Sequence, residues 1–422
     1  MIFKPADVLL PKFCEKSEEM TKWSVVACDQ YTSEPEYWEN TDTIVGCSPS
    51  TLRLIVPEIY LNDENIDSRI SDVNTAMCQY VSDGIFEEYK NTYIYIERTQ
   101  ANGAVRRGIV GCVDLEEYDY SVGSVSKIRA TEGTVLSRIP PRLKVRTDAA
   151  VELPHIMMLI DDLDRDIIEY NGSVKDSFEK VYDFDLMNNS GHILGYRMSR
   201  EACDILDRKL SALEDIESFN CKYGLDVCNP LVFAVGDGNH SLATAKAHFE
   251  NIKKELGEAA MEHPARYALC ELVNLHDDSL VFEAIHRVVF DADRDKFMDE
   301  LKKMYDISYD SSVSGHKIRL VLGGEAKDIV ITNSDDCLAV GAIQKFIDEF
   351  CSKYGCEVDY IHGEDVVMSL CESDNNIGII LDAMDKRDLF RSVAHQGALP
   401  RKTFSMGDAW DKRFYVEARK IK

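Results

Sequence analysis

Residues 230–256 constrain the fold of this chain more than any other segment. The apolar run at 231–235 predicts a buried strand, and Gly-Asp-Gly-Asn at 236–239 predicts a tight turn directly after it. A helix is expected from Ser241 onward, because apolar residues then return at helical spacing. These residues are Leu242, Ala245, Phe249, Ile252 and Leu256. A strand that turns through glycines into a helix predicts an α/β arrangement with a polar site at the turn.

The predicted turn has the features of an anion site. Free backbone N–H groups of Gly236, Gly238 and Asn239 would meet the positive end of the helix dipole. Ser241, or Asn239 just before it, is the expected N-cap of the helix. We therefore expect these residues to bind phosphate.

Asp237 and His240 lie in the same turn. A carboxylate and an imidazole so placed are suited to metal binding or proton transfer. A strand-to-helix turn whose polar residues only cap the helix is the alternative. The two glycines with Asp, Asn and His together favour the functional interpretation.

Composition limits the partners of the chain. The net charge is −27 and the pI is about 4.8, which argues against a nucleic-acid backbone or an anionic membrane as partner. None of the thirteen cysteines belongs to a Cys-x-x-Cys pair, as in proteins of a reducing cytosol. Because no apolar run approaches membrane-spanning length, we expect a cytoplasmic protein with no membrane partner.

With 422 residues the chain is longer than one ordinary domain. Gly257 and Pro264 interrupt the helical pattern, so the predicted domains are 1–257 and 258–422. Many short apolar runs predict strands, and Asn102-Gly103 predicts a hairpin turn. The expected class is mixed α/β (α+β).

Two further groups are candidates for anion binding. Glu132, Arg138 and Arg142 place a carboxylate near guanidinium groups, which suit phosphate. On spacing alone a basic surface loop is an equal alternative. Arg287 follows His286 in an apolar run and needs a partner, either a structural one or a ligand.

Three common enzyme classes are not supported. The sequence has no Gly-x-Ser-x-Gly elbow and no Gly-x-x-x-x-Gly-Lys-Ser/Thr loop. The pair Gly236 and Gly238 lacks the third glycine of a dinucleotide fingerprint.

Several motifs in order resemble the bacterial family known as domain of unknown function 1015. They lie at 25–31, 132–134 with Arg142, 236–240, 286–287 and 399–403, and the resemblance spans nearly the whole chain. The Asp-Gly-x-His turn at 237–240 is the most specific of them.

The Asp-Gly-His-His-Arg turn of that family resembles the phosphate-binding turn of the ParB/sulfiredoxin superfamily. This superfamily includes nucleotide-binding partition proteins, sulfiredoxin and an archaeal kinase that phosphorylates free serine. The resemblance implies a ParB/sulfiredoxin-like N-terminal domain and a second α/β domain. Asp237, Gly238 and His240 match the family turn, whereas Asn239 and Ser241 replace a histidine and the arginine.

The resemblance implies phosphoryl transfer between a nucleotide and a small hydroxy metabolite, with free serine as the first candidate. The expected cofactors are Mg²⁺ and ATP or ADP. Asp237 would hold Mg²⁺ or orient the hydroxyl group, His240 would contact the phosphate, and Glu132 would be the general base. Arg142 and Arg287 would bind anionic groups.

The direction of transfer stays open, so a kinase and a phosphatase-like enzyme are both compatible with the sequence. The alternative function is a non-catalytic regulator that binds a nucleotide or a metabolite. The expected partners of the protein are a nucleotide and a hydroxy metabolite. A homo-oligomer is also compatible with the sequence.

Overall fold

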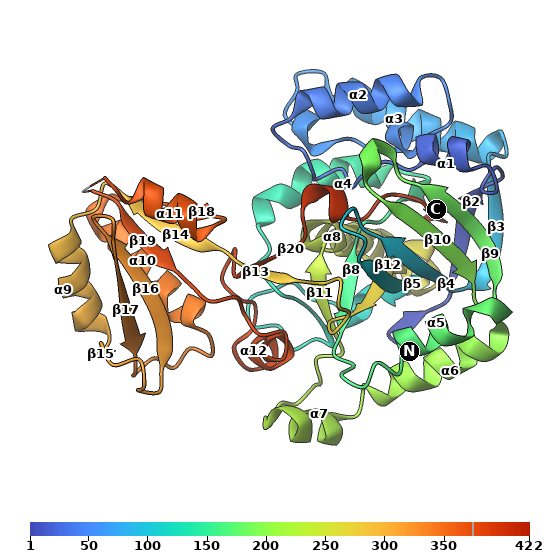
Figure 1. The fold of residues 1–422 in the computed structure, drawn as a ribbon. Coiled ribbons are helices and arrows are strands. Elements are labelled where there is room, and N and C mark those ends of the chain that lie inside the picture. Colours follow the sequence, from blue (N-terminus) through green and yellow to red (C-terminus); the bar gives the residue numbers. More distant parts are fainter. Residues whose placement is uncertain (374) are drawn as a thin grey trace. The chain divides into compact units, whose positions relative to one another are not determined.

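The apolar run at 231–235 lies in a large mixed sheet of the computed structural model, which describes residues 1–373 and 375–422. The chain divides into two units. The first unit comprises residues 1–130, 134–280 and 407–422, and the second comprises 131–133 and 281–406. Figure 1 labels many of the elements of both.

The sheet of the first unit has nine strands. In spatial order they are β6 (Ile128–Ala130), β11 (Phe233–Asp237), β8 (Met157–Ile160), β12 (Tyr267–Asn274), β5 (Val105–Asp114), β4 (Ile94–Thr99), β10 (His192–Arg197) and β9 (Glu179–Asp185), with β1 (Phe3–Lys4) beside β5. The pairs β6–β11 and β8–β12 are parallel, and the other pairs are antiparallel.

Eight helices of the first unit are α1 (Ser17–Trp23), α2 (Pro35–Val45), α3 (Ile66–Ser82), α4 (Ile139–Thr147), α5 (Ile168–Val174), α6 (Arg200–Ala212), α7 (Ile216–Tyr223) and α8 (Asn239–Leu256). Two short strand pairs complete it: β2 (Ala6–Pro11) with β3 (Phe86–Thr92), and β7 (Val151–Glu152) with β21 (Arg419–Lys420).

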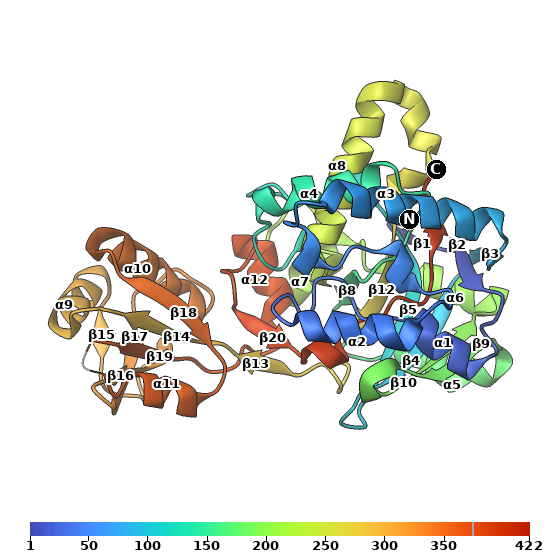
Figure 2. The same ribbon diagram turned by 90° about the horizontal axis from the view of Figure 1, so that it is seen from above.

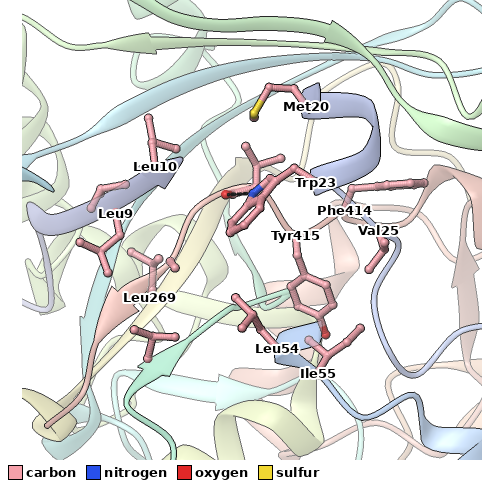
Figure 3. Packing of buried hydrophobic residues seen from close by; sticks show 14 of the residues in the cluster. Leu9, Leu10, Met20, Trp23, Val25, Leu54, Ile55, Leu269, Phe414 and Tyr415 are labelled. Carbon is pink, nitrogen blue, oxygen red and sulfur yellow. Dashed lines mark hydrogen bonds between the residues drawn. The ribbon is translucent and has the colours of Figure 1, made fainter. Parts of the chain in front are cut away.

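The central strands β8 and β12 are buried on both faces of the large sheet, which explains why they are apolar without alternation. Ile94 and Ile96 of β4 pack into one core, and Tyr93 and Tyr95 pack into another on the opposite face. Trp23 of α1 lies in the first of these cores, where its indole N–H donates to the carbonyl of Val416 at 2.9 Å (Figure 3). Helices α6 and α8 pack on the second core.

The segment 407–422 returns to the first unit after residues 281–406, which form the main part of the second unit. Phe414, Tyr415 and Val416 are buried in the same core as Trp23. This segment also supplies Arg413, whose guanidinium pairs with the buried carboxylate of Glu271. The last residues are therefore part of the core of the first unit.

The second unit has an antiparallel six-stranded sheet. In spatial order its strands are β15 (Ile307–Ser308), β17 (Glu325–Ile331), β16 (His316–Leu322), β19 (Ile377–Ile380), β14 (His286–Phe290) and β18 (Glu357–Ile361). Figure 2 shows α9 (Arg294–Met304) and α10 (Ala339–Tyr354) on one face and α11 (Glu364–Leu370) on the other. The remaining elements are β13 (Phe282–Ala284), which pairs with β20 (Phe404–Met406), and α12 (Asp388–Gln396).

The α+β class predicted from the sequence is confirmed, as is the hairpin at Asn102-Gly103, which joins β4 to β5. The division into units differs from the predicted domains 1–257 and 258–422. The helical pattern does stop near Gly257, but the chain then forms β12, which lies between β8 and β5 in the first sheet. A loss of helical periodicity shows where a helix ends. It does not show whether a domain ends at the same place. The relation of the first unit to the ParB/sulfiredoxin fold stays a prediction.

None of the helices in the described residues is both long and apolar enough to cross a membrane.

Candidate functional site

The junction of β11 and α8 consists of one residue, Gly238. Its φ is +76°, and a Cβ built there would lie 2.9 Å from the Cα of Ile156, so both the backbone angle and the close approach require glycine. The predicted turn at 236–239 is wrong in its bounds, because Gly236 and Asp237 still belong to β11. The pairing of β11 with β8 shifts register at Gly236, which marks a β-bulge.

The predicted cap of α8 is also wrong. The helix begins at Asn239, its N-cap is Gly238, and no side chain forms a capping hydrogen bond. Ser241 is the third helical residue, and its hydroxyl lies 3.0 Å from Nε2 of His155. Glycine is itself among the residues preferred at an N-cap, although it offers no side-chain acceptor.

Asp237 ends β11 with a half-buried side chain. One carboxylate oxygen accepts from the N–H of Gly238 at 2.9 Å, and the other lies 3.2 Å from Nζ of Lys412. Lys412 comes from the segment 407–422. The junction therefore contains a cation that sequence analysis did not assign to it.

His240 lies in the first turn of α8 and is half-buried. Its Nε2 accepts from the backbone N–H of Val135 at 3.2 Å, so the ring proton is on Nδ1. Burial lowers the pKa of His240, and the charges of Arg142 and Arg138 lower it further. The neutral ring can donate one hydrogen bond from Nδ1 to a ligand.

His155 lies two residues before β8 and is the centre of a buried hydrogen-bonded group. Its Nε2 lies 3.5 Å from a carboxylate oxygen of Asp29 and 3.0 Å from Oγ of Ser241. Its Nδ1 lies 2.7 Å from the hydroxyl of Tyr415. Asp29 accepts a further bond from the side chain of Gln30 at 2.9 Å.

The ionisation of His155 and Asp29 follows from their contact. Burial alone would lower the pKa of His155, but the charge and hydrogen bond of Asp29 outweigh burial and raise it. Burial alone would raise the pKa of Asp29, and the charge and hydrogen bond of His155 hold it below its usual value instead. The pair is therefore favoured as imidazolium and carboxylate.

Arg142 of α4 belongs to the first unit, as do Asp237 and His240. Its guanidinium pairs with Glu58 at 2.5 Å and donates to the carbonyl of Arg138 at 2.7 Å. An anion would therefore compete with Glu58 for this guanidinium.

Glu132 and Arg287 belong to the second unit. A carboxylate oxygen of Glu132 accepts from the N–H of Lys402 at 3.1 Å. Burial raises the pKa of Glu132, although the charge and backbone N–H of Lys402 oppose the effect. A shared cleft for Glu132 and Arg142 stays a prediction.

The guanidinium of Arg287 is fully buried within the second unit. It donates to the side chain of Gln344 at 3.1 Å and to the carbonyls of Lys402 at 2.9 Å and Ile285. Burial lowers its pKa to about 10. These bonds favour the structural alternative, and a phosphate-binding role for Arg287 stays a prediction.

Sequence analysis missed His155, Lys412 and Tyr415 as members of this group. Asp29 directly follows an apolar run, and a polar residue at such a position indicates a candidate site. The sequence around His155 and Tyr415 has no comparable pattern. Throughout residues 1–373 and 375–422, no three or more His, Cys, Asp or Glu side chains are grouped so that they could hold a metal ion.

The family model for a protein of unknown function, DUF1015, matches residues 12–350. The chain belongs to this family. A search of curated proteins finds no match.

Three solved structures are among those that the comparison matches to this chain. A mutant of free serine kinase in complex with AMP is 11% identical with a TM-score of 0.40, and the match covers 74% of this chain and 91% of that one. A conserved hypothetical protein from Pyrococcus furiosus is 11% identical with a TM-score of 0.35, covering 74% and 94%. SbnI with a C-terminal truncation, from Staphylococcus aureus, is 10% identical with a TM-score of 0.37, covering 71% and 82%.

Proposed function

We propose that this DUF1015 protein binds a nucleotide phosphate at the N-terminus of α8 and transfers a phosphoryl group to or from a small hydroxy metabolite, with serine as the first candidate. The observation that carries the proposal is the junction of β11 and α8. There the one-residue turn at Gly238 brings Asp237, His240 and Ser241 to the start of an 18-residue helix. The dipole and the free N–H groups of such a helix favour an anion.

The charges around the junction suit a phosphate that must be held and then released. Lys412 contributes a positive charge beside Asp237, and neutral His240 can donate a hydrogen bond. His155, next to Ser241, is favoured in its positively charged form by Asp29, whose carboxylate balances that charge. Phosphoryl transfer depends mainly on positioning and charge neutralisation, which these groups supply.

In the proposed reaction the hydroxyl oxygen of the acceptor attacks the terminal phosphorus of the nucleotide. The bond from that phosphorus to the bridging oxygen breaks, the shortened nucleotide leaves, and the hydroxyl proton passes to Glu132. The raised pKa of Glu132 makes its carboxylate a better base. Arg142 would bind a nucleotide phosphate by exchanging Glu58 for it.

Asp237 fits the cofactor expected with a nucleotide. Mg²⁺ commonly takes one or two protein carboxylates and completes its shell with phosphate oxygens and water, so a single aspartate is sufficient. Asp237 would hold the ion after releasing Lys412. When bound, Mg²⁺ supplies neutralisation of the phosphate charge.

The test has two stages. Thermal shift with AMP, ADP and ATP, with and without Mg²⁺, should raise the melting temperature by mass action. Phosphorus NMR of the protein with ATP or ADP and a panel of hydroxy amino acids should then detect a phosphorylated product, or loss of phosphate from phosphoserine. Asp237→Asn is the matched control, because it should fold yet produce no product.

A regulator that binds nucleotide without turnover is the second candidate. The bonds of Arg142 to Glu58 and of Arg287 to backbone carbonyls favour it, since neither guanidinium is poised for a transferring phosphoryl group. Nucleotide binding with no product from any acceptor, and with phosphoserine left intact, would select this candidate.

A further inference from the structure

His155 determines which way the hydroxyl proton of Ser241 points. A carboxylate of Asp29 and the hydroxyl of Ser241 both face Nε2, at 3.5 and 3.0 Å. Because an ionised carboxylate can only accept, its approach favours a proton on Nε2 in either charge state of the ring. Oγ of Ser241 is then the acceptor of that N–H, and its own proton is directed away from the ring.

The ring is fixed from its other nitrogen as well. Nδ1 lies 2.7 Å from the hydroxyl of Tyr415, which accepts from the backbone N–H of Cys28 at 3.2 Å. His155 and Tyr415 are both buried, and the rings meet edge to face with centroids 5.6 Å apart. His155 is thus held by residues from three distant segments and cannot rotate without breaking several bonds.

The electrostatic surroundings favour the charged ring. Asp29 and, more weakly, Asp237 raise the pKa of His155, whereas burial and the charge of Arg142 lower it. Lys412 acts on the other member of the pair, since its charge lowers the pKa of Asp29. A protonated ring strengthens the bond to Ser241, because a charged donor makes a stronger hydrogen bond than a neutral one.

We infer that Asp29 and His155 are positioning residues that make Ser241 a hydrogen-bond donor to a phosphate group at the first turn of α8. The inference rests on the proposed function, because it assumes that a phosphate occupies this helix terminus. The ligand chemistry is that of a phosphate ester or anhydride, whose oxygens accept from the Ser241 hydroxyl.

The competing explanation is purely structural. Asp29, His155 and Tyr415 join segments far apart in the chain, and Ser241 could simply complete their hydrogen bonds. The two explanations differ in what Ser241→Ala does. A structural role predicts unchanged nucleotide affinity, whereas a donor role predicts weaker binding of phosphate-bearing ligands only.

The experiment is calorimetric titration of the full chain with ADP, AMP and adenosine. Ser241→Ala should weaken ADP binding about tenfold or more, which is the effect of one hydrogen bond to a charged group, and leave adenosine unchanged. Thr244→Val is the matched control, because Thr244 lies one turn on in α8 and bonds to the carbonyl of His240. It should not change either affinity.

The dependence on His155 is tested by a double-mutant cycle. His155→Leu should weaken ADP binding, His155→Gln should recover part of the loss because its amide can donate in place of Nε2–H, and the double variant with Ser241→Ala should be no weaker than Ser241→Ala alone. If the His155 variants do not fold, Asp29→Asn takes their place in the cycle. Nitrogen NMR of the wild-type ring should show a proton on Nε2.

The outcomes of these experiments separate failure of the inference from failure of the proposed function. Equal ADP affinity for wild type and Ser241→Ala, additive effects in the cycle, or a ring with no proton on Nε2 would overturn the inference. A wild-type protein that binds neither ADP nor AMP refutes the proposed function, and with it the phosphate role of Ser241. That failure is read from the wild type alone, so it is distinguishable from failure of the inference.

Discussion

Replacing Gly238 with alanine should destabilise the first unit by two separable effects. The left-handed backbone at φ +76° costs an alanine about 1–2 kcal/mol. In addition, the new Cβ would lie 2.9 Å from the Cα of Ile156 and 3.3 Å from its backbone nitrogen. Since a backbone cannot turn aside as a side chain can, the overpacking should cost about 1–3 kcal/mol more.

Gly224 provides the matched control for Gly238→Ala. It also has a left-handed φ, +64°, and lies in the first unit, but a Cβ there would meet nothing within 4 Å. Gly224→Ala therefore carries the backbone cost without the close contact, and the entropy lost by the unfolded chain is the same for both variants. The difference in the free energy of unfolding between the variants should be about 1–3 kcal/mol.

Urea unfolding followed by tryptophan fluorescence measures this difference. The three tryptophans, Trp23, Trp38 and Trp410, all belong to the first unit, so the signal reports the unit that contains both glycines. The Gly238→Ala transition should have the lower midpoint with an unchanged slope. Equal midpoints for the two variants would refute the argument that β11 and the segment before β8 approach too closely for a side chain.

Three further predictions concern ionisable groups. Asp237→Asn and His240→Ala should abolish product formation yet keep the melting temperature within a few degrees of wild type. Both side chains are half-buried, and a partly exposed ion pair contributes less than about 1 kcal/mol to stability. If either variant unfolds, the replaced side chain has a packing role instead. Asp29→Asn should lower the pKa of His155 in a proton NMR titration. The loss in free energy of unfolding relative to wild type should be largest between pH 3.8 and 6.5, the unfolded-state pKa values of Asp29 and His155. The Asp29 contribution is lost as the pH falls through its depressed pKa, and the His155 contribution is lost as the pH rises through its raised pKa; a deficit that does not vary with pH would contradict the ion pair. Arg287→Ala should destabilise the second unit, as seen by calorimetry, because it leaves buried carbonyls without donors; a stable variant with weakened nucleotide binding would instead identify a phosphate ligand.

Local patterns were sufficient to predict the elements that position the site. The strand at 231–235 and the helix after it follow from an apolar run and a 3.6-residue period, and neither depends on the rest of the chain. The bounds of the turn were less accessible, because the bulge at Gly236 arises from pairing with β8. Ser241 resembles a helix cap in sequence, and only the approach of His155 shows its actual partner.

The residues that complete the site lie too far away in sequence for any local pattern to connect them. His155 is 86 residues from Ser241 and 260 residues from Tyr415. Their contacts depend on the order of strands in the sheet and on the return of the segment 407–422 to the first unit. Arg287 was different, since a lone guanidinium in an apolar run already required partners, and the structure provides them as backbone carbonyls.

The return of the segment 407–422 has a consequence for how the protein is made. A ribosome produces about 5–20 residues per second, so the stretch from Leu280 to Lys422 takes on the order of ten seconds. During that time Glu271 has no Arg413, His155 has no Tyr415, and the core around Trp23 is open. The second unit, whose main stretch 281–406 is contiguous, can fold during this interval. The first unit, although begun earlier, is completed last, and its nascent form is the one that chaperones and proteases would encounter.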